Sequence, residues 1–403
     1  MLTTIEAQAT ILREIGDLGS ERVATGNCVG RMLRQAVAAE RDQPPFDRVM
    51  MDGIAVRFDE LSAGTRSFAI EGTQHAGDPQ MTLPEGRCIE IMTGASLPDG
   101  ADCIIPVERI STEGGEAVVE SDYTAQRRQF IHPRASDHAA EAALLRPGKR
   151  IMPADVAIIV SAGLADVEVS SVPRIRVIST GNELVPAGEP IEDHQIRLSN
   201  GPALVAMLTQ HGYLRTEHDH LLDDREAMRE RIAEHLGSSD VLVLSGGVSM
   251  GKADFVPEVL KELGVQVVFH RVSQRPGKPM WFGIGPSGQS VFALPGNPVS
   301  NLVCCRQYVI PALHKASGGT ALPPEFATLS QPVSFKPALT CFLPTRIVSN
   351  AAGQLLALPT PTNTSGDFAS LTGTEGYLEL ALEQTDFPSG TTVPLHRWQH
   401  PAH

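Results

Sequence analysis

Apolar and amphipathic segments alternate along residues 172–316. Short runs predict strands at 175–178, which is apolar and β-branched, at 241–244, 265–272 and 290–294, and, as a plausible strand, at 214–221. The helical periodicity between them predicts helices at 201–210, 224–236, 254–263 and 299–314, the first capped by Ser199 or Asn200 and followed by Gly212. Strands that alternate with helices at this spacing indicate a parallel sheet covered by helices on both faces.

The rest of the chain shows helical and β-like patterns in separate stretches. Helical patterning covers residues 2–40, with a break at 16–26, and returns at 147–169, where Val156, Ile159 and Val160 share one face. Short β-like runs, such as 87–92 and 103–107, fill residues 43–120, and alternating patches such as 377–382 and 391–394 follow residue 322. These patterns predict a multi-domain α/β plus β protein. We expect a helical domain in two segments (1–43 and 142–171), a β-rich insertion (44–141), an α/β domain (172–316) and a small β-barrel or sandwich (317–403).

Composition narrows the possible partners. The 403 residues exceed the roughly 250–300 at which single cores stop growing, and 33 basic against 47 acidic residues give a net charge of −14. This charge argues against a broad surface for nucleic acid or an anionic membrane, so an anionic ligand requires a local positive site. No apolar run reaches the roughly 18 residues of a membrane helix, so we expect a cytoplasmic protein. The six cysteines lack C-x-x-C spacing and are expected to be reduced, mostly buried thiols.

Three of the predicted strands end in loops rich in Gly and Ser. These loops are S-T-G-N-E-L at 179–184, S-G-G-V-S-M-G-K-A-D at 245–254 and L-P-G-N-P-V-S at 294–300. Ligands of open α/β sheets bind at the carboxyl ends of the strands. The backbone N–H groups of the second loop and the hydroxyls of Ser245 and Ser249 suit a phosphate, although its spacing is neither that of a P-loop nor of a dinucleotide motif. A tight strand-to-helix turn is the alternative.

Acidic residues lie beside these loops. Glu183 follows the first strand, Asp223 and Asp224 follow the second, and Asp254 follows the S-G-G segment. Converging carboxylates would supply the hard oxygen ligands that Mg²⁺ prefers, with water and substrate phosphates completing its coordination shell. The alternatives are a helix cap for Asp224 and a solvated loop for Glu183.

A basic turn and two polar turn residues complete the candidate chemistry. Arg275 and Lys278 frame the Pro-Gly turn of Q-R-P-G-K-P and could form the local positive site, with surface solvation as the alternative. Asp52 precedes Gly53 in M-D-G-I-A-V, and Thr93 lies in M-T-G-A-S-L-P-D-G-A-D. Taken alone, Asp52 and Thr93 are ordinary turn residues.

Six segments occur in this chain order: M-D-G-I-A-V, M-T-G-A-S-L-P-D-G-A-D, S-T-G-N-E-L, S-G-G-V-S-M-G-K-A-D, R-P-G-K-P and L-P-G-N-P-V-S. Together they resemble the molybdopterin molybdenumtransferase family, which includes bacterial MoeA and the gephyrin E domain. The resemblance implies a MogA-like α/β domain, a helical domain with a β-rich insertion, and a C-terminal β-barrel. It also implies a homodimer whose active site lies between the α/β domain of one subunit and the insertion of the other. The implied reaction transfers molybdate to the dithiolene of adenylylated molybdopterin, with Mg²⁺-dependent release of AMP. A pterin adenylyltransferase and molybdoenzyme maturation proteins are the implied partners.

The resemblance also assigns roles to matching positions. It implies catalytic roles for Asp52, Thr93, Glu183, Asp223 and Asp254, with Asp223 and Asp254 as Mg²⁺ ligands. It implies that Arg275 and Lys278 hold molybdate. The remaining positions implied in substrate binding are Ser245, Gly246, Gly247, Ser249, Pro295, Gly296, Asn297, Pro298, Ser300 and Ser365.

The sequence departs from the family pattern at four places. Ile54 replaces a Tyr, Ala135-Ser136 replaces the centre of R-G-E-D, Leu198 replaces an acidic residue, and Leu339-Thr340 stands where an Arg is usual. These losses leave open a non-catalytic pterin-binding or scaffold homologue. A further alternative is an α/β nucleotide pyrophosphatase that shares only the central module. The sequence does not distinguish molybdate from tungstate.

Overall fold

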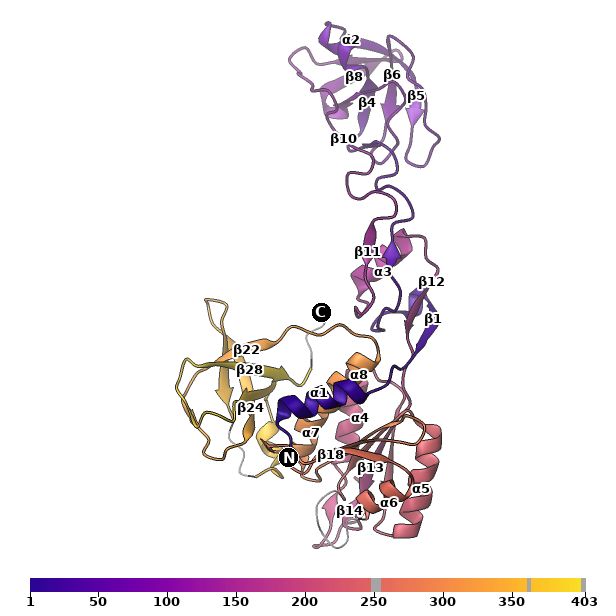
Figure 1. The fold of residues 1–403 in the computed structure, drawn as a ribbon. Coiled ribbons are helices and arrows are strands. Elements are labelled where there is room, and N and C mark those ends of the chain that lie inside the picture. Colours follow the sequence, from indigo (N-terminus) through magenta and orange to yellow (C-terminus); the bar gives the residue numbers. More distant parts are fainter. Residues whose placement is uncertain (248–254, 361–363, 400–403) are drawn as a thin grey trace. The chain divides into compact units, whose positions relative to one another are not determined.

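The computed structural model describes residues 1–247, 255–360 and 364–399. The chain divides into two compact units: Met1–Gln35, Pro147–Val156 and Asp166–His403 form one, and Ala36–Arg146 with Ala157–Ala165 form the other (Figure 1). Among the described residues, none of the helices has the length and apolar character needed to cross a membrane. All six cysteines are free and buried, as predicted.

A six-stranded sheet forms the centre of the larger unit. Its strands, in spatial order, are β16 (Thr216–Leu221), β13 (Ile175–Thr180), β17 (Val241–Ser245), β21 (Ser290–Leu294), β20 (Trp281–Ile284) and β18 (Gln266–His270). The first four strands are parallel, which confirms the predicted parallel arrangement. Strand β20 runs antiparallel to both of its neighbours and has no counterpart among the predicted strands. Its four residues are too few to show a periodicity.

Helices cover both faces of this sheet, as predicted. Val177, Val243 and Phe292 face one side, which packs on α1 (Thr4–Glu14), α4 (Asn200–Gln210) and the continuous helical stretch α7 (Pro298–Cys304), η3 (Cys305–Val309) and α8 (Ile310–Ala316). Leu242 and Leu244 face the opposite side, which packs on α5 (Arg225–Ser238) and α6 (Val256–Glu262) (Figure 1). Burial on both faces explains why the inner strands β17 and β21 are nearly continuous apolar runs.

The C-terminal region forms a closed β-barrel, so the barrel alternative is confirmed. Its strands are β24 (Thr340–Ser349), β25 (Leu355–Pro359), β22 (Glu325–Leu329), β28 (Thr392–Arg397) and β26 (Gly376–Leu380), and β26 pairs back onto β24. A short strand of the α/β region, β19 (Gln274–Arg275), adds to β24 in parallel register. This pairing fixes the start of the R-P-G-K-P turn to the barrel. The pairs β23 (Val333–Ser334) with β27 (Asp386–Phe387), and β14 (Leu184–Val185) with β15 (Ile196–Arg197), are smaller additions.

The predicted helical patterning is only partly correct. Helix α1 is present, but residues 31–40 contain the strand β2 (Val37–Ala38) instead of a second helix. Helix α3 (Pro153–Ser161) accounts for part of 147–169, and β12 (Asp166–Ser170) follows it and pairs antiparallel with β1 (Ser20–Ala24). Val160 is 60% exposed, so it does not share the buried face of Ile159. Strand partners distant in sequence override local helical patterning here.

The smaller unit is β-rich, as expected for the insertion. Its main sheet has the order β7 (Cys103–Pro106), β4 (Gly53–Val56), β6 (Arg87–Ile91), β5 (Ser67–Gln74), β9 (Glu116–Val119) and β8 (Ile110–Glu113). Helix α2 (Phe58–Ser62) and two short pairs, β3 (Arg48–Val49) with β10 (Ile131–His132) and β2 with β11 (Ala143–Leu145), complete it. The internal strand β4 is buried throughout, and Asp52 immediately precedes it.

Candidate active site

The carboxyl ends of the four parallel strands bring the predicted loops of the larger unit together. The Gly246 N–H donates to the Leu294 carbonyl at 3.2 Å, which joins the loops after β17 and β21. The Asp223 N–H donates to Asn182 Oδ1 at 2.9 Å, and the Asn182 N–H donates to Asp223 Oδ2 at 3.3 Å. These bonds join the loops after β16 and β13. Four segments that are distant in sequence therefore form one edge.

Gly247 shows why the loop after β17 requires glycine. Its φ is +67°, and a Cβ atom there would lie 2.6 Å from Cγ2 of the fully buried Val256 and 3.0 Å from Oγ1 of Thr180. A side chain would be strained and would also collide with the core. The loop backbone can therefore approach a ligand closely, as the phosphate interpretation requires.

Ser245, the last residue of β17, is held by two asparagines that the sequence did not mark as site residues. Asn200 Nδ2 donates to Ser245 Oγ at 3.0 Å and to the Gly296 carbonyl at 2.7 Å. Asn301 Nδ2 donates to the same Oγ at 2.8 Å and to the Pro295 carbonyl at 3.1 Å. Ser199 occupies the N-cap of α4, but its side chain makes no cap hydrogen bond. The available signal for Asn301 was an amide within the mostly apolar sequence of α7.

The acidic residues divide into a helix cap and candidate ligands. Asp224 Oδ1 accepts the Ala227 N–H at 2.9 Å and caps α5, so the cap alternative for Asp224 is correct. The side chain of Glu183 is exposed, and Asp223 is partly buried beside Asn182. Within the described ranges, no three His, Cys, Asp or Glu side chains converge as a metal site. Asp254 and Ser249 lie outside the described residues. The oxygen donors of Asp223 and Glu183 suit Mg²⁺, which commonly takes one or two carboxylates together with phosphate and water.

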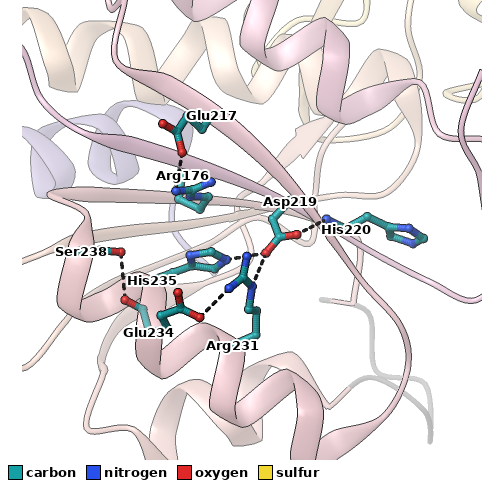
Figure 2. Close-up of polar contacts among 8 residues, drawn as sticks. All are labelled: Arg176, Glu217, Asp219, His220, Arg231, Glu234, His235 and Ser238. Atoms are coloured by element: carbon teal, nitrogen blue, oxygen red, sulfur yellow. Dashed lines mark hydrogen bonds and ion pairs between the residues drawn. The ribbon is translucent and has the colours of Figure 1, made fainter.

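A charged cluster fixes the edge strand that leads to Asp223. Asp219 Oδ2, in β16, accepts hydrogen bonds from Arg231 Nε at 2.7 Å and from His235 Nε2 at 2.7 Å, both on α5 (Figure 2). Burial raises the pKa of Asp219, but the hydrogen bonds from Arg231 and His235, together with their electrostatic attraction, outweigh it, and the pKa falls below its usual value. Burial lowers the pKa of His235, so its imidazole is neutral near pH 7. The cluster therefore attaches β16 to α5 and holds the start of the Asp223 loop.

The basic turn after β18 carries two exposed cations. Arg275 and Lys278 are both exposed, and no carboxylate in the described part of the chain forms an ion pair with either. The Arg275 guanidinium lies over the Phe335 ring, 5.9 Å from its centroid, on the barrel side of the turn. Cations without an acidic partner keep their charge available for an oxyanion. This arrangement fits the predicted local positive site.

The barrel also reaches the loop after β21. Asn297 Nδ2 donates to Ser365 Oγ at 2.7 Å, and the Val299 N–H donates to the Ser365 carbonyl at 3.0 Å. Ser365 therefore lies beside the P-G-N-P segment. Ser300 is buried in α7, with only 3% of its surface exposed.

Asp52 and Thr93 meet in the smaller unit. Asp52 Oδ1 accepts hydrogen bonds from Thr93 Oγ1 and from the Thr93 N–H, both at 2.7 Å. The hydroxyl bond and the backbone bond lower the pKa of Asp52, so its side chain is a carboxylate at neutral pH. Both residues are exposed, and together they form a fixed anionic group at the surface.

The departures from the family pattern have structural roles of their own. Ile54 is 1% exposed in the core of the smaller unit, and Leu198 is also buried. The Arg134 guanidinium pairs with Asp42 at 2.7 Å, and Asp137 bonds to His132 Nε2 at 2.9 Å, so both ends of R-A-S-D are engaged locally. The Thr340 N–H donates to the Ser273 carbonyl at 3.0 Å, beside β19.

The fold and the site define a multi-domain protein whose α/β sheet presents glycine-rich loops, carboxylates and exposed cations for an anionic ligand. Three family models match the chain: the MoeA N-terminal region (domain I and II) over residues 2–163, a probable molybdopterin binding domain over 176–315, and the MoeA C-terminal region (domain IV) over 327–398. The chain belongs to the molybdopterin molybdenumtransferase (MoeA) family.

Relatives and solved structures cover the chain along its length. Curated proteins named molybdopterin molybdenumtransferase are 36% identical in Synechocystis sp. (99% of this chain, 100% of the relative) and 33% identical in Synechococcus elongatus (96% of each). A crystal structure of the molybdopterin biosynthesis MoeA protein from Pyrococcus horikoshii superposes with a TM-score of 0.84 at 28% identity, covering 100% of both chains. Another crystal structure of a molybdopterin biosynthesis MoeA protein, from Pyrococcus horikoshii OT3, superposes with a TM-score of 0.80 at 25% identity, covering 98% of this chain and 99% of the other.

Proposed function

We propose that this transferase carries out the molybdenum insertion step of molybdenum cofactor biosynthesis, using adenylylated molybdopterin and molybdate and releasing AMP in a Mg²⁺-dependent reaction. The names of the full-length relatives support the transferase and its pterin substrate. The observation that carries the proposal is the carboxyl edge of the central sheet. There one hydrogen bond joins the S-G-G loop to the end of β21, and two others join Asp223 to Asn182 of the S-T-G-N-E-L loop. Binding of a phosphate-bearing pterin and an oxyanion requires such backbone N–H groups, hydroxyls and carboxylates close together.

Each group of residues has a proposed task. The backbone of Gly246 and Gly247, with the Ser245 hydroxyl, binds phosphate oxygens. Arg275 and Lys278 hold molybdate near the dithiolene, because fixed cations stabilise an oxyanion where water is excluded. Asp223 and Asp254 would hold Mg²⁺, which when bound offsets the negative charge of the pyrophosphate. The protein mainly orients its substrates, because the dithiolene sulfurs are themselves the nucleophiles toward molybdenum.

The proposal includes the organisation of the enzyme. We propose four domains with the boundaries expected from the sequence and a homodimer in which Asp52 and Thr93 of one subunit complete the site of the other. The hydrogen-bonded Asp52–Thr93 pair supports this role because it presents a carboxylate that its own unit leaves exposed. We expect the enzyme to act in the cytoplasm and to exchange substrate and product with a pterin adenylyltransferase and with molybdoenzyme maturation proteins.

The test is an assay of AMP release from adenylylated molybdopterin, with and without molybdate and Mg²⁺. Asp223→Asn keeps the size of the side chain but removes its charge, and we expect at least a tenfold loss of molybdate-dependent AMP release, or about 1.4 kcal/mol of transition-state stabilisation. Asp193→Asn, in an exposed loop, is the matched control and should retain activity. Tight pterin binding without AMP release at any molybdate concentration would instead support the scaffold alternative. Hydrolysis of ordinary dinucleotides would support the pyrophosphatase.

A further inference from the structure

Ser245 receives hydrogen bonds from two different side-chain amides. Asn200 Nδ2, at the start of α4, lies 3.0 Å from Ser245 Oγ, and Asn301 Nδ2, in α7, lies 2.8 Å from the same atom. Ser245 is 3% exposed and Asn301 is 0% exposed. The three residues therefore form a polar cluster at the carboxyl edge of the sheet.

The direction of both hydrogen bonds follows from a second contact of each amide. Asn200 Nδ2 also contacts the Gly296 carbonyl at 2.7 Å, and Asn301 Nδ2 also contacts the Pro295 carbonyl at 3.1 Å. A main-chain carbonyl can only accept, so the NH₂ group of each amide must face it. The same NH₂ groups face Ser245, and each therefore donates to its hydroxyl oxygen.

The two amides leave the Ser245 hydroxyl with its O–H donor as the one group still available for a hydrogen bond. A serine hydroxyl has two acceptor lone pairs and one O–H donor, and the two amides occupy both lone pairs. In the part of the chain that the structure describes, no acceptor receives the Ser245 proton. Ser245 thus offers a hydrogen bond and cannot accept another.

The amide oxygens support this interpretation. Oδ1 of Asn200 and Oδ1 of Asn301 are buried without a hydrogen-bond partner among the described residues. An unsatisfied buried acceptor is costly, and native structures contain few of them. Both side chains leave the oxygen unpaired while their NH₂ groups make two bonds each. Both amides therefore act in this site as hydrogen-bond donors, through their NH₂ groups.

We infer that Asn200 and Asn301 are positioning residues that fix the Ser245 hydroxyl as a hydrogen-bond donor for an anionic oxygen of the substrate. The inference rests on the proposed function and deepens it, because the group it selects is a phosphate-type oxygen. Preorganisation strengthens the contact, since the hydroxyl does not have to reorient when the ligand binds. A ligand atom that can only donate a hydrogen bond is rejected at this position.

The test is a double-mutant cycle on the full-length protein, with pyrophosphate and AMP as equilibrium probes in calorimetry. Ser245→Ala removes the donor and should weaken probe binding about 10- to 100-fold, as expected for a hydrogen bond to a charged group. Asn301→Leu removes the amide that donates to Ser245, and because leucine is uncharged it adds no electrostatic repulsion toward the anionic probes. It should weaken binding about threefold to tenfold when Ser245 is present and less than about twofold in the Ser245→Ala background.

The cycle separates positioning from a merely structural role. If Asn301 only supports the loop at Pro295, its effect will persist in the Ser245→Ala background, and the additive result will overturn the inference. Gln307→Leu removes an equally buried amide from the same helical stretch, where Gln307 accepts from Tyr377, and should leave probe binding unchanged. If Asn301→Leu does not fold, Asn200→Leu, at the partly exposed start of α4, takes its place with the same expectations.

Failure of this inference is distinguishable from failure of the proposed function. A wild-type protein that binds neither pyrophosphate nor AMP overturns the inference. If the effects of the Ser245 and Asn301 substitutions on probe binding are coupled, but the protein releases no AMP from adenylylated molybdopterin, the inference stands and the proposed function is removed. If the effects of the Ser245 and Asn301 substitutions are additive in a protein that does release AMP, the inference is overturned and the proposed function stands.

Discussion

Replacing Gly277 by alanine should both destabilise the larger unit and weaken its oxyanion site. Gly277 lies between Arg275 and Lys278 at φ +92°, where a Cβ atom would lie 2.4 Å from Cys304 Sγ and 2.6 Å from Gln274 Nε2. Neither neighbour can easily move, because both side chains are fully buried and Gln274 also accepts a hydrogen bond from Tyr308.

The magnitude has two parts. Placing an L-residue in a left-handed conformation costs about 1–2 kcal/mol, and forcing extra atoms into a packed core costs about 1–3 kcal/mol more. Gly277→Ala should therefore lower the free energy of unfolding by about 2–5 kcal/mol. Gly390→Ala is the matched control, since its φ is +87° and no atom lies within 4 Å of its Cβ position. It should show only the backbone part, about 1–2 kcal/mol.

The assay is urea unfolding of both variants followed by tryptophan fluorescence, with molybdate affinity measured on the folded proteins. We expect Gly277→Ala to unfold at lower urea than Gly390→Ala and to bind molybdate more weakly, because the turn that carries both cations is displaced. Adding Cys304→Ala should restore part of the lost stability by removing the nearest clash. Equal destabilisation by the two glycine substitutions, with unchanged molybdate affinity, would refute the packing argument.

Three further predictions concern charge. Burial lowers the pKa of His211 to about 4, so only the unfolded chain takes up this proton as the pH falls from 6.5 toward 4. Stability should therefore fall by up to about 3 kcal/mol over this window, and His211→Gln should flatten the dependence in urea unfolding at pH 7 and 4.5. Lys278→Gln should weaken molybdate binding by about tenfold or more, whereas Arg229→Gln, an exposed cation on α5, should not; equal losses would indicate a general charge effect. Asp219→Asn should lower stability at pH 7 by about 1.5–3 kcal/mol, with a smaller difference from wild type once the pH falls through the depressed carboxyl pKa. An unchanged difference at low pH would contradict the role given to the Asp219 carboxylate.

Local sequence patterns predicted the elements whose signals lie within one segment. The apolar runs of β13, β17 and β21 identified the parallel core. Asp224 precedes an amphipathic stretch, and the alternative that it caps a helix is correct. The strand-end argument also brought Asp223 to the same edge as the S-G-G loop. These predictions succeed because burial on both faces and capping leave their mark within a few residues.

Other features depend on partners that are distant in sequence. Asn200 and Asn301 meet Ser245 across separations of 45 and 56 residues, and only the folded sheet shows that their amides converge. Residues 31–40 have helix-like spacing, but β2 pairs with β11, more than 100 residues later in the chain. The six ordered motifs located Asp52 and Thr93, whereas their hydrogen bond required the structure.

The central claim is that this edge of the sheet supports molybdenum insertion. The most direct measurement is the release of AMP when purified protein is mixed with adenylylated molybdopterin, Mg²⁺ and increasing molybdate. We predict that AMP appears in proportion to the molybdenum transferred, and that Asp223→Asn loses this release while the Asp193→Asn control retains it. Release of AMP at the same rate without molybdate, or retention of full activity in Asp223→Asn, would contradict the account.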